Sequence, residues 1–360
     1  MLQDTVKTTP LAEAAEKDGP TWVDFAGFRM PVQFEGIVAE HMAVRRHAGL
    51  FDISHMGRLM VRGEGAGEAL DRLLTRRVSD MTLSAIRYSF IVDAEGNILD
   101  DLMVARRRDA WQLIVNAVNR ERVITHMENE GYGHLLEDLT FETAMLALQG
   151  PASAELLERV WPEADAITRR RYHLWCMPRN GRVMCGSRSG YTGSDGYEIH
   201  GPPEAVSALW TDLREAGAAP CGLGSRDSLR NEAALPLYGH ELNEQSSPWE
   251  LGLAYSVDLS KDFVGSEEFR RRHDAGISRM RVGLVLTGRR IARENMAVYD
   301  GDVQIGCITS GTWSPLREAP IAQAMLDVAH AMEGRPVTID IRGRRERATV
   351  VGLKSLLPRS

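Results

Sequence analysis

The sequence predicts an α+β fold followed by a small all-β domain. Helical and strand-like apolar patterns are interspersed along residues 37–216 without strict alternation, which favours α+β over a doubly wound parallel sheet. From residue 281 onward the chain consists of short strand-like segments separated by turns, which indicates a compact β domain. The charged stretch at 266–274 is predicted to be a helical link between these two parts.

The elements of the first part follow from apolar spacing and turn residues. Residues 21–31 lack a clear period and are predicted to be a loop, and the Asp-Ala-Glu-Gly-Asn turn at 93–97 predicts a β-hairpin. Helices are predicted at 37–47, 64–76, 120–130, 153–160 and 204–216. Strands are predicted at 58–61, 88–92, 98–105, 111–116, 145–149, 183–187 and 197–200. The C-terminal strands are expected at 282–286, 297–298, 304–309, 337–341 and 348–353.

Size and charge exclude some classes of function. The chain has 360 residues, and 43 basic against 50 acidic side chains give a net charge of −7. This balance argues against a general binder of nucleic acid or of membrane surfaces, which needs a positive field. No run of about 18 apolar residues is present, so no membrane span is expected. Only four of the basic residues are lysines, and we attribute most of the arginine excess to genome composition. Some arginines could instead recognise carboxylate or phosphate.

Cysteine and histidine spacing gives no sign of a disulfide framework or a metal centre. The four cysteines (Cys176, Cys185, Cys221 and Cys307) include no CxxC pair, and a chain of this length needs no staple. We therefore expect a reduced, cytoplasmic protein. The ten histidines show no HxH or HExxH spacing, so no metal site is predicted.

Two adjacent carboxylates interrupt the apolar segment ILDDLMV at 98–104. Side chains alternate between the two faces of a strand, so Asp100 and Asp101 must point opposite ways. One of them is expected to face an interior or a cavity, where a carboxylate needs a donor or a cation. It could be an acid, base or positioning group, or simply a strand-end residue that caps a turn.

A glycine-rich segment, SGYTGSDGYE, occupies residues 189–198. Its three glycines permit tight backbone geometry and close approach of a ligand. Tyr191 offers a flat face for stacking, and Glu198 could accept two parallel hydrogen bonds from an amino-substituted ring. The same residues could form no more than a β-hairpin loop.

The segment GLGSRDSLRNEA at 222–233 predicts a helix with Ser225 as N-cap, ending before Pro236. Arg226 and Arg230 are four residues apart and share a face. An anionic ligand on that face would relieve their repulsion, and so would pairing with nearby or distant acids.

Together these segments resemble the aminomethyltransferase (T-protein) family of the glycine cleavage system. The likeness covers nearly the whole chain, and its nine segments occur in the family's order. They are VDFAGF at 23–28 with Met30 and Pro31, FDISHMG at 51–57, ILDDLMV at 98–104, ALQGP at 147–151, SGYTGSDGYEI at 189–199, CGLGSRDSLRNEA at 221–233, LYGHELNE at 237–244, KDFVG at 261–265 and ITSGTWSP at 308–315.

The resemblance implies a three-domain cloverleaf. Two intertwined α+β folate-binding domains would occupy residues 9–275, and a C-terminal β-barrel would occupy 280–356. It also implies a tetrahydrofolate-dependent transfer in which the lipoyl arm of H-protein delivers an aminomethyl group. Ammonia then leaves, methylenetetrahydrofolate forms and the arm is returned as a dithiol. We expect a monomer whose partners are folate and lipoylated H-protein.

Carried over position by position, the resemblance implies that Asp101 is the catalytic aspartate. It implies that Glu198 grips the amino edge of the pterin and that Arg230 is the arginine near the cofactor. The folate pocket would also include Tyr88, Asn116 and Tyr191.

Two other members of the wider group remain alternatives. One is a folate-dependent demethylase that acts on a small methylated compound. The other is a non-catalytic folate-binding protein of the iron–sulfur maintenance type, which has a cysteine in the glycine-rich loop where this chain has Ser189 and Gly190 before Tyr191. The sequence also departs from the T-protein pattern at Ser225, Asn231 and Pro236.

Overall fold

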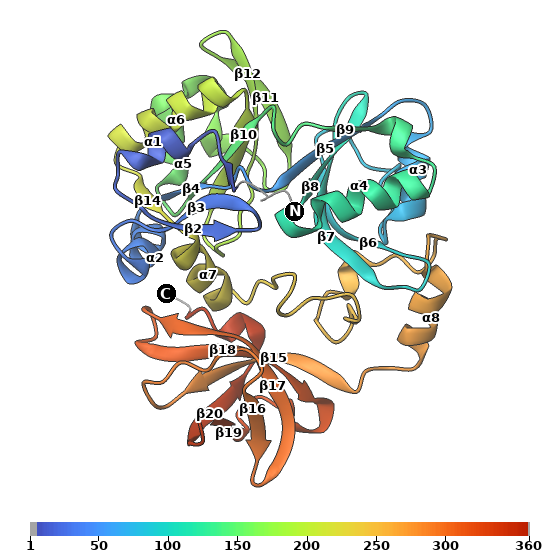
Figure 1. Ribbon diagram of the computed structural model, residues 1–360, viewed down its shortest axis with the longest axis vertical. Coiled ribbons are helices and arrows are strands. Elements are labelled where there is room, and N and C mark those ends of the chain that lie inside the picture. The colour runs from blue at the N-terminus through green and yellow to red at the C-terminus, as the bar shows by residue number, and fades with distance from the viewer. Residues whose placement is uncertain (1–5, 359–360) are drawn as a thin grey trace. The chain divides into compact units, whose positions relative to one another are not determined.

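The computed structural model describes residues 6–358, which divide into two compact units. Of these residues, 6–89 and 101–226 form the first unit, and 90–100 and 227–358 form the second. The structure contains both helices and sheets, and the strands and helices do not alternate strictly along the chain. The predicted α+β class is therefore confirmed (Figure 1).

A six-stranded sheet forms one half of the first unit. Its strand order is β11 (Leu174–Arg179), β12 (Arg182–Ser187), β13 (Gly196–Gly201), β10 (Ala144–Gln149), β4 (Gly49–Asp52) and β14 (Ala219–Cys221). Every residue of the central strand β10 is buried. Helices α5 (Ser153–Val160) and α6 (Pro203–Glu215) pack on this sheet (Figure 1). The apolar core between them includes Leu146, Leu148, Ile199, Leu157 and Trp210.

A five-stranded sheet contains most of the other strands of the first unit. Its order is β6 (Ile86–Val92), β7 (Ile98–Arg106), β8 (Ala110–Val115), β5 (Gly57–Arg62) and β9 (Leu136–Asp138). The turn at 93–97 joins β6 to β7 as predicted, with the backbone N–H of Asn97 donating to Asp93. Helix α3 (Ala66–Leu73) contacts β8.

The N-terminal segment corrects the expectation of a loop at 21–31. Residues there form β2 (Thr21–Phe25) and β3 (Phe28–Gln33), which pair antiparallel, and β1 (Lys7–Thr8) joins β3 in parallel. Most of β2 is exposed, so it carries no alternating buried face for the sequence to reveal. The remaining helices are α1 (Ala12–Glu16), α2 (Ile37–Arg46), α4 (Arg120–Asn129), α7 (Leu223–Glu232) and α8 (Ser266–Asp274). Short 3₁₀ helices lie at Ala117–Asn119, Gly133–Leu135, Pro162–Ala164, Ala166–Thr168, Ala254–Ser256, Val328–His330 and Leu353–Ser355.

A closed six-stranded barrel fills most of the second unit (Figure 1). Its strands follow the order β15 (Arg279–Leu286), β18 (Ala319–Asp327), β17 (Val303–Ser314), β16 (Ala297–Asp300), β19 (Pro336–Asp340) and β20 (Arg345–Val351). Alternate side chains such as Val282, Leu284 and Leu286 point into its core. The predicted C-terminal β-barrel is therefore confirmed.

Two of the four cysteines are paired. Cys176 in β11 and Cys185 in β12 are directly opposite each other and form a disulfide. Their spacing of nine residues gave no sign of this pair, because the pairing depends on the register of two strands. Cys221 and Cys307 are free.

Candidate active site

Asp101 on β7 is held by two side chains from neighbouring strands. The hydroxyl of Tyr88 on β6 donates to one carboxylate oxygen at 2.9 Å. The amide of Asn116, which directly follows β8, donates to the other at 2.8 Å and to the Asp101 carbonyl at 3.2 Å. The structure therefore brings together three of the predicted site residues.

Burial raises the pKa of the Asp101 carboxyl group, and the hydrogen bonds from Tyr88 and Asn116 offset only part of that effect. A carboxyl group tuned upward from its ordinary value is better placed to take up and return a proton near neutral pH. Its neighbour Asp100 is completely buried. The two aspartates thus have different surroundings, as strand alternation predicts.

A second cluster forms around the glycine-rich loop at 189–198. The hydroxyl of Ser189 donates to Glu198 at 2.7 Å, and Glu198 is the third residue of β13. The guanidinium of Arg226, on the first turns of α7, lies 4.9 Å from the centre of the Tyr191 ring, a cation–π distance. Tyr191 and Glu198, both predicted site residues, therefore share their surroundings with Arg226, which the helix spacing singled out together with Arg230 but the family resemblance did not assign.

Arg226 is a half-buried cation with an unused hydrogen-bond donor. Burial lowers the pKa of its guanidinium, while the charges of Glu198 and Tyr191 raise it in part. Its Nη1 atom is buried and has no hydrogen-bond partner within residues 6–358. An unsatisfied buried N–H is costly, so this atom is suited to bind an acceptor on a ligand.

Gln149, the last residue of β10, anchors the glycine-rich loop through two hydrogen bonds. Its amide donates to the Ser189 carbonyl at 3.1 Å and its oxygen accepts from Thr192 at 2.8 Å. A Cβ atom at Gly190 would lie 1.9 Å from that side-chain oxygen. A side chain at this position would therefore force the Gln149 side chain or the loop to move.

His55, within the FDISHMG segment, is a further group whose role the sequence did not reveal. It is buried, and its Nδ1 atom has no partner among the residues described. Burial, assisted by the charges of Arg226 and Arg58, lowers the pKa of His55 to about 3. The imidazole is therefore neutral at physiological pH.

Arg230 lies four residues after Arg226 on α7 but belongs to the second unit. All three of its guanidinium nitrogens are engaged: Nε donates to Asp227 at 2.8 Å, Nη1 to Glu241 at 2.7 Å and Nη2 to Ser310 at 2.7 Å. Glu241 is buried, which raises its pKa, but Arg230 and the hydroxyls of Ser310 and Thr309 lower it further than burial raises it. Arg230 is thus committed to internal contacts.

The helix that carries both arginines starts three residues earlier than expected, at Leu223. Ser225 lies inside the first turn instead of at the N-cap, and its hydroxyl donates to the buried Glu40 at 2.8 Å. Asn231 accepts a hydrogen bond from Gln323 on β18 at 3.2 Å. Two positions that depart from the T-protein pattern are therefore accommodated by polar contacts.

The described residues 6–358 contain no cluster of three or more His, Cys, Asp or Glu side chains that could hold a metal ion. The same part of the chain contains no helix with the length and apolar character needed to cross a membrane.

A carboxyl group of raised pKa, held by hydrogen bonds to both of its oxygens, is suited to proton transfer in an enzyme. Comparison with known proteins identifies the family. Residues 11–261 match the GCVT N-terminal domain, and residues 279–354 match the glycine cleavage T-protein C-terminal barrel domain. The chain belongs to the glycine cleavage T-protein family.

Individual relatives agree with this assignment. The aminomethyltransferase of Symbiobacterium thermophilum is 38% identical over 367 residues, covering 97% of both chains. The aminomethyltransferase of Rubrobacter xylanophilus is 43% identical over 319 residues, covering 88% of this chain and 86% of the other. The crystal structure of aminomethyltransferase T from Bartonella henselae superposes with a TM-score of 0.91 at 33% identity, covering 98% of this chain and 99% of that one.

Proposed function

We propose that the chain is the tetrahydrofolate-dependent aminomethyltransferase of a glycine cleavage system. It would transfer the methylene of the aminomethyl group on the lipoyl arm of H-protein to tetrahydrofolate, with release of ammonia. The observation that carries this proposal is the Asp101 carboxyl group, whose pKa is raised and whose two oxygens are fixed by Tyr88 and Asn116.

The cluster around Glu198 fits a folate. Its carboxylate can accept two N–H groups from an amino-substituted pterin edge, and the Tyr191 ring offers a stacking face. The free Nη1 donor of Arg226 suits a carbonyl or carboxylate of the same ligand. Tetrahydrofolate would supply the two nitrogens that receive the one-carbon unit.

We assign the arginine of the folate site to Arg226 in place of Arg230. Both occupy α7, but the donors of Arg230 are already taken by Asp227, Glu241 and Ser310. Arg226 retains an unsatisfied donor beside Tyr191 and Glu198. A ligand can gain a hydrogen bond from Arg226 without breaking an existing ion pair.

Asp101 would accept the proton that the attacking folate nitrogen loses and stabilise the cationic carbon that develops as ammonia departs. Tyr88 and Asn116 are positioning residues in this scheme, because each holds one oxygen of the carboxyl group. We also propose that the enzyme works in the cytoplasm as a monomer, with lipoylated H-protein as its protein partner.

The deciding assay supplies tetrahydrofolate and aminomethylated H-protein and measures both ammonia and methylenetetrahydrofolate. Equal formation of the two products supports the proposal. Absence of turnover in a folded sample with a cognate H-protein would contradict it. Turnover of a small N-methyl amine in the absence of H-protein would assign the chain to the demethylases instead.

A further inference from the structure

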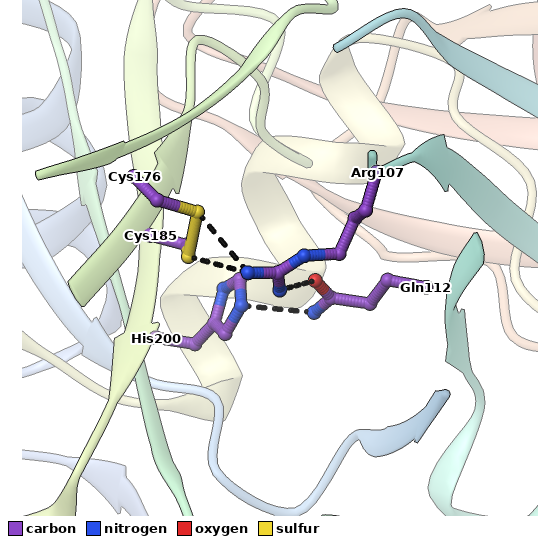
Figure 2. Close-up of a disulfide and its surroundings, with 5 residues drawn as sticks. All are labelled: Arg107, Gln112, Cys176, Cys185 and His200. Atoms are coloured by element: carbon purple, nitrogen blue, oxygen red, sulfur yellow. Dashed lines mark hydrogen bonds between the residues drawn. A yellow bond between two sulfur atoms is a disulfide. The ribbon is translucent and has the colours of Figure 1, made fainter. Parts of the chain in front are cut away.

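The disulfide between Cys176 and Cys185 involves none of the residues assigned to folate or to proton transfer. It joins directly opposite residues of β11 and β12 (Figure 2). Cys176 is exposed, whereas Cys185 is 6% exposed. One sulfur is therefore open to attack from solvent, and the other is sheltered.

Arg107, in the turn between β7 and β8, points its guanidinium at both sulfurs. Its Nη2 atom lies 3.3 Å from the sulfur of Cys176 and 3.3 Å from that of Cys185, as Figure 2 shows. A disulfide sulfur is a weak acceptor. Two such contacts replace little of the hydration that the guanidinium gives up when it is partly buried.

No acidic side chain pairs with Arg107 anywhere in residues 6–358. Burial lowers the pKa of its guanidinium, and the positive charge of Arg62 lowers it further. Glu142 lines the same cavity of about 240 Å³ but is exposed and forms no ion pair with Arg107. The guanidinium is therefore a half-buried cation without a counter-ion, and the groups nearest to its Nη2 atom are two sulfurs.

Gln112 and His200 fix the guanidinium in this position. The Nη1 atom of Arg107 donates to the Gln112 side-chain oxygen at 3.0 Å. That leaves the Gln112 amide nitrogen, 2.9 Å from Nε2 of His200, as a donor to the ring. His200 therefore accepts on Nε2 and is neutral. Burial, with the charges of Arg107 and Arg58, lowers the pKa of His200 to about 3.

We propose that Cys176 and Cys185 form a reversible thiol–disulfide exchange site, open to small thiols, in which Arg107 supplies the counter-ion for the reduced state. An external thiolate attacks the exposed sulfur of Cys176, forms a mixed disulfide and releases the Cys185 thiolate beside Arg107. A second external thiolate attacks the external sulfur of the mixed disulfide and releases the Cys176 thiolate. Two thiols are oxidised to one disulfide, and the protein disulfide takes up the two electrons.

The positive charge on Arg107 favours the reduced state of this site. A thiolate is a much stronger acceptor than a disulfide sulfur, so the hydrogen bonds from Nη2 become charge-assisted when the site is reduced. Stabilising the leaving thiolate also speeds the first step. The nearby groups Gln112 and His200 are neutral and do not oppose a new negative charge.

The test is a redox titration of the full chain in glutathione buffers, with thiols counted by maleimide labelling and mass spectrometry. Cys307→Ser serves as the background, because Cys307 is the other partly exposed thiol among the described residues. We expect a Cys176–Cys185 disulfide in oxidising buffer that is reduced reversibly. In Arg107→Met the equilibrium constant for reduction of the disulfide should fall about tenfold or more, because the thiolate loses a charge-assisted hydrogen bond.

Arg108→Met is the matched control, since Arg108 is the exposed neighbour in the same turn. It should titrate like the background, and Arg107→Lys should recover part of the loss. As a separate readout, the alkylation rate of Cys185 in Cys176→Ser should show a thiol pKa that rises when Arg107 is replaced. Failure of the disulfide to form in oxidising buffer, or identical titrations of Arg107→Met and Arg108→Met, would overturn the proposal.

Discussion

Asp101 combines partial burial with one hydrogen bond to each carboxylate oxygen, an arrangement that fixes both the place and the direction of proton transfer. Replacing it with asparagine keeps the shape and removes the titrating group. We expect Asp101→Asn to lower kcat by about 10²–10⁴-fold, the usual contribution of a general acid or base. Folate binding, measured by fluorescence or calorimetry, should persist.

The same variant has a predictable effect on stability. The pKa of Asp101 is raised in the folded state, so above a pH of about 4 the unfolded chain binds fewer protons than the folded one. Stability contributed by this group therefore falls as pH rises through that range. Asp101→Asn should leave the free energy of unfolding at pH 7 equal or higher.

Asp100→Asn is the comparison for the activity measurement. If Asp100→Asn alone abolishes turnover, the catalytic role belongs to Asp100.

Arg226 and Arg230 should respond to replacement in opposite ways. Arg226→Met removes a buried donor without a partner, so we expect the affinity for folate to fall about ten- to hundred-fold with stability retained. Arg230→Met leaves the buried Glu241 without its ion pair and should cost about 3–5 kcal/mol of unfolding free energy. Folate titration and urea unfolding of both variants distinguish the two roles. Loss of folate binding in a stable Arg230→Met would return the ligand role to Arg230.

The sequence alone could not choose between these two arginines. Their spacing placed both on one face of a helix, but which of them meets an acid depends on residues far away, such as Glu241 and Ser310. The proximity of three residues that the family resemblance implies follows from local geometry. Tyr88, Asp101 and Asn116 do meet, because a hairpin and the next strand fix their positions.

At the scale of elements, the glycine-rich loop depends on the absence of a side chain at Gly190. A methyl group there would meet the Gln149 side chain and displace the loop that carries Tyr191. We expect Gly190→Ala to weaken folate binding about tenfold or more without unfolding the protein, because a shift of about 1 Å can cost that much. Calorimetric titration with folate measures the effect.

Gly181→Ala provides the control for that experiment. Gly181 lies in the turn between β11 and β12, has a φ of +77° and has no atom within 4 Å of an added Cβ. The substitution adds backbone strain without a collision. Normal folate affinity in Gly181→Ala together with weakened binding in Gly190→Ala would support the steric account. Equal losses in both would contradict it.

Several elements were predictable from charge and apolar spacing, but strands β18 and β2 were not. Helix α8 (Ser266–Asp274) begins and ends where the charge pattern places it, and α5 (Ser153–Val160) matches its apolar spacing. Strand β18 (Ala319–Asp327) was missed because eight of its nine residues are buried or half-buried, so it shows no alternation. Strand β2 was missed for the opposite reason, since most of its residues are exposed.

At the scale of the whole molecule, two buried neutral histidines make the first unit sensitive to acid. The folded-state pKa values of His55 and His200 are both about 3, whereas an unfolded histidine titrates near 6.5. Below pH 6.5 the unfolded chain binds protons that the folded chain does not, so stability falls as pH decreases toward 3. Each histidine should contribute a slope of about 1.4 kcal/mol per pH unit at 25 °C.

His200→Gln tests this expectation. A glutamine can still accept from Gln112 but does not titrate, so the fall in unfolding free energy between pH 6 and pH 4 should be shallower than in the parent chain. His134→Gln is the control because His134 is exposed. Urea unfolding at several pH values gives the slopes. An unchanged slope in His200→Gln would show that His200 is not a source of acid sensitivity.

The second unit is built from two separate segments of the sequence, which affects how the chain folds during synthesis. Residues 90–100 belong with residues 227–358, and the backbone N–H of Ile98 donates to the carbonyl of Glu244. On the ribosome this hairpin tip emerges long before its partners exist. A fragment that starts at residue 227 would lack it altogether. We therefore expect that no single cut in the chain separates the two units into fragments that each contain all of their residues.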